Sequence, residues 1–368
     1  MTGDSNIETR LCEWYIEKAI EEIPFSTWRA DNDRVPAVLV VEGFEERSIG
    51  FLRRLADTKV SVPALVLGRY GDNGDLNVEF REEFEALASR VASGRWQVVE
   101  LKDGEDWARE AAQLVGGNEL IVDISALTTR GIFFALDRLT RHSRHVSIAY
   151  SEAGEYRPTR EEWEGLLREV AGDVDEDTLI AEKADEMPWL YSGTHHAEIV
   201  TGHEGFDAAG VNALVAFFPF KCARLAAVLG EQDYSAYVFI AGRPRLEGNS
   251  WRLEALMRIN ASVVKDWPIV DMDTFGYKST LSALSKEICS DEGLLQRFDV
   301  HLAPMGSKLQ KVACWVLSML VPSVTVTTAV THGYYPEAFS HGVGESWVFP
   351  LLDPNMAFQA LQCLPAPK

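Results

Sequence analysis

The chain has 368 residues, of which 46% are apolar, and its formal net charge is −21. That length is sufficient for two domains of ordinary size. A surface this acidic disfavours bulk binding to nucleic acid or to an anionic membrane, although it still allows a local basic pocket. Residues 1–10 are polar and predict no secretory signal, and no apolar run reaches the roughly 18 residues of a membrane-spanning helix. We therefore expect a soluble, cytoplasmic protein that has no membrane partner.

The N-terminal region, residues 1–35, is predicted to form a helix and a polar approach to the first domain. Ile16, Ile20 and Ile23 share one helical face there.

Short apolar runs then alternate with amphipathic stretches up to residue 154. Continuous apolar strands separated by amphipathic helices predict a parallel sheet covered on both faces. We interpret residues 36–154 as a first Rossmann-like lobe. Its expected strands are 37–41, 64–68, 96–101, 119–124 and 145–150, and its expected helices are 45–56, 82–92, 106–115 and 128–139.

The alternation stops in residues 155–207, which are strongly charged. We expect a helical connector in which the charge run 159–187 is a solvated helical face. Residues 192–207 are predicted to form a short hairpin.

The alternation resumes in residues 208–368, which we interpret as a second Rossmann-like lobe. Its expected strands are 212–218, 236–242, 268–273, 298–304 and 323–330, and its expected helices are 220–229, 250–260, 279–288 and 307–320.

The order of elements is the same in both halves. LIVDISALTTRGIFFAL lies about 180 residues before DVHLAPMGSKLQKVACW, and Gly43-Phe44 to Arg47 is similar to Pro219-Phe220 to Arg224. The prediction is an α/β fold of two pseudo-duplicated Rossmann-like lobes with parallel sheets, joined by a helical insert.

Polar residues collect where predicted strands end and helices begin. Ligands of open parallel sheets bind at these ends, where unsatisfied N–H groups and the helix dipole favour an anion. Arg69 follows one strand, and Arg243 and Arg245 follow its counterpart. We expect these ends to bind phosphates in a cleft between the lobes. The candidate ligand-binding residues are Gly43, Arg47, Asp123, Ser125, Thr128, Thr129, Arg130, Tyr156, Arg243, Arg245, Gly306, Ser307, Lys308 and Tyr335.

Ordinary helix capping is the alternative for these turns, because Ser, Thr and Asp are common N-caps. The G-x-x-x-x-G-K-[ST] and G-x-G-x-x-G patterns are both absent from the turns, so neither a P-loop nor a standard dinucleotide site is expected. We predict no cofactor.

The same turns resemble the ligand turn of CRISPR-associated Rossmann-fold (CARF) domains, which are related to the paired SAVED domains. The matching residues are Asp123, Ser125, Thr128, Thr129 and Arg130, and in the second half Gly306, Ser307 and Lys308. The resemblance covers the layout of about 37–150 and 212–350, and it implies a cyclic oligonucleotide ligand and a role in antiviral defence. Because no effector module is visible in the sequence, the effector would be a separate protein of the same system.

Two further clusters of polar residues have other interpretations. Asp271 and Asp273 alternate at a strand end, where they would bind Mg²⁺, act as acid and base, or cap the following turn beside Lys278. A histidine-rich cluster lacks H-E-x-x-H spacing, so no metal site is predicted. That cluster consists of His195, His196, His203, Glu204 and Asp207.

The loop GYYPEAFSHGVGESW contains aromatic side chains that would stack on a nucleobase or fill an interface between lobes. The G-x-S-x-G pattern of a Ser-His-Asp triad is missing, so the catalytic residues, if any, stay unknown. The five cysteines include no C-x-x-C pair, and we expect buried, inert thiols. They are Cys12, Cys222, Cys289, Cys314 and Cys363.

Our leading functional prediction is a sensor or regulatory subunit that binds an anionic, nucleotide-type small molecule and works with a protein partner. The main rival is an enzyme that acts on a nucleotide or nucleotide-sugar in the same cleft. A third possibility is an acidic scaffold for a partner protein.

Overall fold

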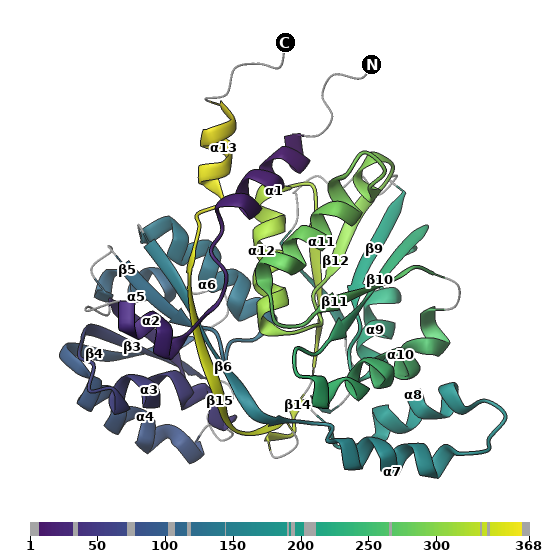
Figure 1. The fold of residues 1–368 in the computed structure, drawn as a ribbon, viewed down its shortest axis with the longest axis horizontal. Coiled ribbons are helices and arrows are strands. Elements are labelled where there is room, and N and C mark those ends of the chain that lie inside the picture. The colour runs from purple at the N-terminus through teal and green to yellow at the C-terminus, as the bar shows by residue number, and fades with distance from the viewer. Residues whose placement is uncertain are drawn as a thin grey trace. The chain divides into compact units, whose positions relative to one another are not determined.

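The protein divides into two compact units, shown in Figure 1 and described here one at a time. The first lobe comprises Ile20–Arg157 and Pro336–Asp353, and the second comprises Met1–Ala19, Pro158–Tyr335 and Pro354–Lys368. The computed structural model describes residues 7–31, 36–71, 78–101, 107–115, 119–143, 145–189, 191–192, 196–201, 211–264, 267–331, 333–336 and 339–362.

The sheet of the first lobe has the strand order β1-β15-β6-β5-β2-β3-β4. Its parallel part runs β4-β3-β2-β5-β6, which is the order 3-2-1-4-5 of the first five strands of a Rossmann fold. These strands are β2 (Ala37–Val41), β3 (Val62–Tyr70), β4 (Ala92–Leu101), β5 (Glu119–Asp123) and β6 (His145–Tyr156). The strands β15 (Ser340–Leu351) and β1 (Ile23–Pro24) extend the sheet in antiparallel pairing beyond β6.

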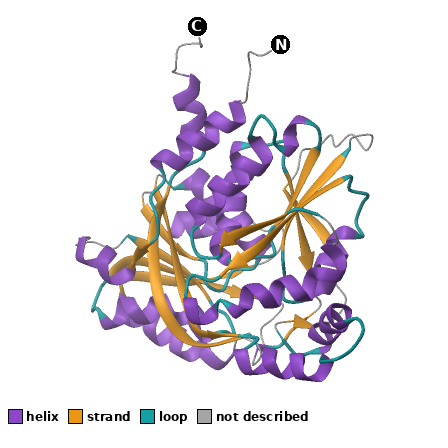
Figure 2. Ribbon diagram, turned by 45° about the vertical axis from the view of Figure 1, so that its right-hand side comes forward, coloured by secondary structure: helices purple, strands orange, loops and turns teal. Residues whose placement is uncertain are grey.

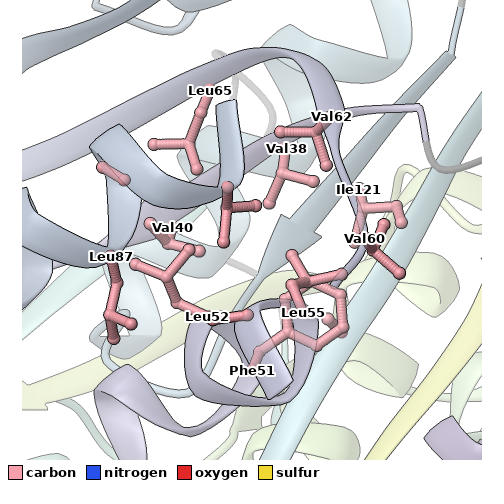
Figure 3. Packing of buried hydrophobic residues seen from close by; sticks show 14 of the residues in the cluster. Val38, Val40, Phe51, Leu52, Leu55, Val60, Val62, Leu65, Leu87 and Ile121 are labelled. Atoms are coloured by element: carbon pink, nitrogen blue, oxygen red, sulfur yellow. The ribbon is translucent and has the colours of Figure 1, made fainter. Parts of the chain in front are cut away.

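Helices cover this sheet because each has an apolar face to bury. Figure 3 shows Val38 and Val40 of β2 packed with Leu52 and Leu55 of α3 (Gly50–Asp57) and with Leu87 of α4 (Val78–Val91). Each such side chain contributes about 1.5–3 kcal/mol when it is buried. All five residues of β2 are buried, as expected of a central strand covered on both faces. The remaining helical elements of this lobe are α2 (Phe25–Asp31), the short 3-10 helix η1 (Glu46–Ile49), α5 (Trp107–Val115) and α6 (Thr129–His142).

The sheet of the second lobe repeats the arrangement, with the order β11-β10-β9-β12-β13-β8. The five strands from β11 to β13 are parallel in the same 3-2-1-4-5 order, and β8 pairs antiparallel with β13, just as β15 pairs with β6. These strands are β9 (Asn212–Phe217), β10 (Ala236–Arg243), β11 (Ile269–Asp273), β12 (Asp299–Ala303), β13 (Thr325–Val330) and β8 (His196–Thr201). The predicted α/β fold of two duplicated Rossmann-like lobes is therefore confirmed, although each sheet is mixed rather than wholly parallel.

Helices also flank the strands of the second lobe, as the purple and orange ribbons of Figure 2 show. The helices that follow its strands are α9 (Cys222–Leu229), α10 (Trp251–Val264), α11 (Tyr277–Cys289) and α12 (Lys308–Leu320), with short 3-10 turns η2 (Glu247–Asn249) and η3 (Leu294–Gln296). No helix in the described part of the chain is both long and apolar enough to cross a membrane.

The connector between the lobes is helical, as predicted, and belongs to the second lobe. It forms α7 (Arg160–Val170) and α8 (Glu176–Glu186). Its charge run is not merely a solvated face, because the apolar sides of both helices pack on α9 and α10 in one buried cluster. The members of that cluster are Trp163, Leu166, Val170, Ile180, Ala181, Ala184, Trp189, Cys222, Ala255 and Ile259.

The hairpin predicted for residues 192–207 lies partly outside the described residues, which omit 193–195 and 202–207. In the described part, the strand β7 (Tyr191–Ser192) pairs with β14 (Gly333–Tyr334), and β8 pairs with β13. Both pairings join segments more than a hundred residues apart, which local sequence does not reveal.

Segments near the two chain ends alternate in the lobe to which they belong. The helices α1 (Ile7–Lys18) and α13 (Asn355–Gln362) belong to the second lobe, whereas β15 belongs to the first. The observed division thus places residues 336–353 in the first lobe, whereas the expected range 208–368 placed them in the second.

Candidate functional site

Ligands of Rossmann-like sheets bind where the strand order reverses, beyond the carboxyl ends of strands 1 and 4. These strands are β2 and β5 in the first lobe, and β9 and β12 in the second. The predicted polar turns follow these strands or their neighbours in each lobe, so their positions agree with this rule.

The first polar side chains of the turn after β5, Asp123 and Ser125, form hydrogen bonds within the turn and to β6. The backbone N–H and the hydroxyl of Ser125 both donate to Asp123 Oδ1, at 2.9 and 2.5 Å, and the N–H of Ser151 donates to Ser125 Oγ at 2.8 Å. Asp123 and Ser125 are buried. Their observed role is to fix the turn on β6, which matches the structural alternative to ligand binding.

The next residues of this turn begin α6. Thr128 is the N-cap, and its Oγ1 accepts a hydrogen bond from Gly131 N at 3.0 Å. The N–H of Thr128 donates to the Tyr70 hydroxyl at 3.3 Å. Thr129 is buried and Arg130 is exposed. Of the predicted residues in this turn, Arg130 is therefore the one whose side chain is largely open to solvent.

Arg47 and Tyr156 lie in a buried polar cluster of the first lobe. Arg47 forms a two-pronged ion pair with Glu45 at 2.8 and 2.9 Å, and its guanidinium lies 5.5 Å from the centre of the Tyr156 ring. The Tyr156 hydroxyl is 2.9 Å from that of Tyr150 and accepts the N–H of Ala153 at 3.0 Å. Burial lowers the pKa of Arg47 and the Glu45 carboxylate raises it, with a net upward shift. These contacts give Arg47 and Tyr156 a structural role, and we leave both out of the ligand site.

Two further residues of the first lobe are also used in packing or pairing. A Cβ on Gly43 would lie 2.9 Å from the Cβ of Ala126, so this glycine allows the turn after β2 to approach the turn after β5. Arg69 forms ion pairs with the fully buried Glu42 at 2.6 Å and with Glu85 at 2.9 Å.

In the second lobe, hydrogen bonds bring three strand ends together. The N–H of Thr274, just after β11, donates to the carbonyl of Arg243 at the end of β10, at 3.0 Å. The Ser307 hydroxyl, at the start of α12, donates to the carbonyl of Thr274 at 2.5 Å. The loop after β11 therefore links the end of β10 to the turn after β12. We call the residues gathered here the edge cluster: Arg243, Arg245, Asp271, Thr274, Phe275, Ser307 and Lys308.

The two arginines of the edge cluster are more open than Arg47 and Arg69 of the first lobe. Arg243 pairs with Asp271 at 3.1 Å, but their side chains are 58% and 47% exposed. Exposed pairs of this kind contribute only about 0–1 kcal/mol. Arg245 is exposed, with its guanidinium 4.7 Å from the centre of the Phe275 ring, and Lys308 is half-buried at the first residue of α12. A ligand anion that approaches Arg243 would compete with this solvent-screened pair.

Other predicted residues near the edge cluster shape the backbone. Asp273 Oδ1 accepts the N–H of Phe275 at 2.8 Å, which is the turn-capping role weighed for it. Ser307 and Gln310 form a capping box at the start of α12. A Cβ on Gly306 would collide with the Gln310 side chain and would lie 3.0 Å from the Phe217 ring. Gly306 thus leaves room for the helix cap.

The start of α9 holds an arrangement that sequence reasoning missed. This helix follows strand 1, where a Rossmann-like lobe commonly binds phosphate. Here the Asp185 carboxylate, from α8, accepts the N–H of Ala223 at 3.0 Å. Lys221 Nζ donates to the carbonyls of Asp185 and Met187 at 3.0 and 2.6 Å. Burial raises the pKa of Asp185 and lowers that of Lys221. The Asp185 carboxylate therefore lies where a ligand phosphate would bind at the start of α9. The sequence did not single out Asp185, because it is one of many charged residues in the connector.

The remaining candidate residues are dispersed. Tyr335 is half-buried at the end of a second-lobe segment. His196 lies 3.3 Å from Glu198 on the edge strand β8. Among the residues that the structure describes, no three potential metal ligands of the His, Cys, Asp or Glu type come together. His195, His203, Glu204, Asp207 and His332 lie outside the described residues.

The predicted burial is confirmed for the four cysteines that the structure describes, and none of the four forms a disulfide. Cys363 lies outside the described residues. A scan of the chain against models of known protein families finds no match, and a search of curated protein sequences finds no significant match.

Proposed function

We propose that the second lobe binds a nucleotide-type anion at the edge cluster, and that the protein is a sensor that passes the bound state to a partner. The observation that supports this most is the gathering of three cations, two of them exposed and one half-buried, with an aromatic ring at the carboxyl edge of a Rossmann-like sheet. The cations are Arg243, Arg245 and Lys308.

Each part of a nucleotide has a chemical counterpart in the edge cluster. Arg243 would neutralise phosphate oxygens, because its present pair with Asp271 is solvent-screened. Lys308, the first residue of α12, would add a second positive charge at a helix N-terminus. The Phe275 ring and the Arg245 guanidinium would stack on a base, since base–aromatic stacking contributes about 1–3 kcal/mol. Asp271, which now pairs with Arg243, would be released when the phosphate binds.

The first lobe supports this role less well, despite its matching topology. Arg47 and Arg69 both pair with buried carboxylates, Glu45 and Glu42. A ligand that drew either arginine away would break a close ion pair of a buried carboxylate, which is costly in the interior, although Glu42 would keep a longer contact with Arg81 at 3.7 Å. Arg130 is exposed at the start of α6, but Arg47 and Arg69 are held in structural ion pairs, so we place the ligand site in the second lobe.

The proposed partner and biological setting rest on the CARF resemblance of the two turns, which involves Asp123, Ser125, Thr128, Thr129 and Arg130 in the first and Gly306, Ser307 and Lys308 in the second. That resemblance favours a cyclic oligonucleotide as the ligand and a separate effector protein in antiviral defence.

The test is a thermal-shift screen of the full-length protein against mono-, di- and cyclic nucleotides. A ligand at 100 times its Kd should add roughly 2.7 kcal/mol to the free energy of unfolding. The variant R243Q/R245Q should weaken binding by at least about tenfold, or about 1.4 kcal/mol, and should keep its Tm without ligand. The matched control is R160Q/R168Q, which removes the same charge from exposed positions on α7.

Three outcomes would contradict the proposal. Equal loss of affinity in both double variants would mean that general electrostatics, rather than the edge cluster, drives binding. A nucleotide that is consumed during the assay would make the protein an enzyme. A screen without any stabilising nucleotide would favour the acidic scaffold.

A further inference from the structure

Two cysteines far apart in the sequence meet where α1 packs on α11 in the second lobe. The Thr9 hydroxyl of α1 donates to the carbonyl of Cys289, the last residue of α11, at 2.7 Å. Cys12 lies three residues after Thr9 and thus on the same face of α1. The fold therefore directs Cys12 toward the end of α11.

The two thiols are in direct contact. Cys12 and Cys289 share a side-chain hydrogen bond, the Ser285 side chain hydrogen-bonds to both, and both cysteines are 0% exposed. The hydrogen bond from Cys289 lowers the pKa of Cys12 in spite of burial. The same bond, together with burial, raises the pKa of Cys289. Cys12 is thus the thiol with more thiolate character, and the thiolate is the nucleophile in thiol oxidation.

We propose that Cys12 and Cys289 are a redox pair that hydrogen peroxide converts into a disulfide between α1 and α11. In the first step Cys12 sulfur attacks one peroxide oxygen, the O–O bond breaks, and the Cys12 proton leaves with the other oxygen as water. In the second step Cys289 sulfur attacks the Cys12 sulfenic acid, the S–O bond breaks, and the Cys289 proton completes a second water. Two thiols are oxidised and one peroxide is reduced to two waters.

Access to the buried pair requires local opening of α1, whose residues Leu11, Cys12 and Tyr15 are all buried. Oxidation should therefore be slow in the folded protein, and faster under conditions that loosen α1.

The disulfide would change how the lobes are connected along the chain. Residues 12–289 would become a closed ring that contains the whole first-lobe segment Ile20–Arg157. The α1 helix, which directly precedes that segment, would stay attached to the second lobe. The proposed disulfide does not depend on the ligand site proposed above.

The experiment treats the full-length protein with hydrogen peroxide, blocks free thiols with an alkylating reagent under denaturing conditions, and maps tryptic peptides by mass spectrometry. Oxidised protein should have three alkylated cysteines instead of its five, a loss of two. The tryptic peptides 11–18 and 287–297 should be found joined, and thiol reductant should separate them. The Tm of oxidised protein should rise relative to reduced protein.

Variants separate this pair from the other thiols. C12A and C289A should each lose the joined peptides and the Tm rise, whereas C314A, a control at another fully buried cysteine on α12, should keep both. The wild-type peptide map needs no variant, so it stays decisive if an alanine variant fails to fold. The proposal is overturned if peroxide leaves all five thiols alkylatable, oxidises Cys12 only to its sulfenic or sulfinic acid, or joins a different pair of peptides.

Discussion

Replacing Arg47 with Met should strongly destabilise the first lobe, because it breaks a buried ion pair. The side chains of Arg47 and Glu45 are only 6% and 7% exposed, and two guanidinium nitrogens contact the carboxylate. In R47M the Glu45 carboxylate would keep its hydrogen bond from Ser340 but would lose both contacts with the guanidinium. Removing one partner of a buried pair costs about 3–5 kcal/mol.

The contrast with an exposed arginine makes the prediction specific. R243Q breaks a pair whose side chains are about half exposed, so the expected cost is about 0–1 kcal/mol. The double variant E45Q/R47M should be more stable than R47M, because it leaves no uncompensated charge in the interior.

Urea denaturation followed by circular dichroism measures these free energies of unfolding. Hydrogen exchange at β6 and β15 then locates the loss, since Tyr150, Tyr156 and Ser340 of these strands contact the pair. If R47M lost less than about 1 kcal/mol and instead abolished nucleotide binding, Arg47 would be a ligand residue and our structural assignment would be wrong.

Two further predictions concern pH and the start of α9. Burial lowers the pKa of His301 to about 4, so between that value and 6.5 the unfolded chain binds a proton that the folded chain does not. The free energy of unfolding should therefore fall as the pH decreases through this window. In H301F this fall should be smaller by about 2–4 kcal/mol. If the two proteins gave the same dependence of stability on pH, the shifted pKa assigned to His301 would be wrong. Burial raises the pKa of Asp185, so the folded protein keeps its proton to higher pH than the unfolded chain. Relative to D185N, the wild-type protein should thus lose stability as the pH rises just above the usual aspartate value of about 3.9, and a difference independent of pH would contradict this reasoning. D185A, which also removes the acceptor for Ala223 N, should cost about 1 kcal/mol in urea denaturation, and an unchanged midpoint would mean that α9 does not need this cap.

The order of strands and helices could be predicted because its signal is local. A central strand such as β2 is apolar throughout, and a helix such as α12 starts at a Ser that caps its own first turn. The position of the polar turns also followed from sequence, since helix caps come directly after the strands that precede them. The duplicated topology was visible for the same reason, because each lobe repeats these local patterns in the same order.

The pairing of the edge strands and the packing of the connector had no such signal. The strand β15 pairs with β6 nearly 200 residues earlier, and α8 places Asp185 on a helix start 38 residues later. Both contacts depend on surfaces that exist only after the lobes have folded.

Sequence alone thus determined that this protein has two Rossmann-like lobes, with polar turns at the carboxyl ends of their strands. Only the tertiary structure decided which of the chemically similar arginines in those turns face solvent. Arg47 and Arg243 both belong to predicted ligand turns, yet one is buried against Glu45 and the other lies half exposed beside Asp271. An arginine can bind a ligand anion only if it is accessible and is not already paired with a buried carboxylate. Its burial and its pairing both depend on residues that folding brings together.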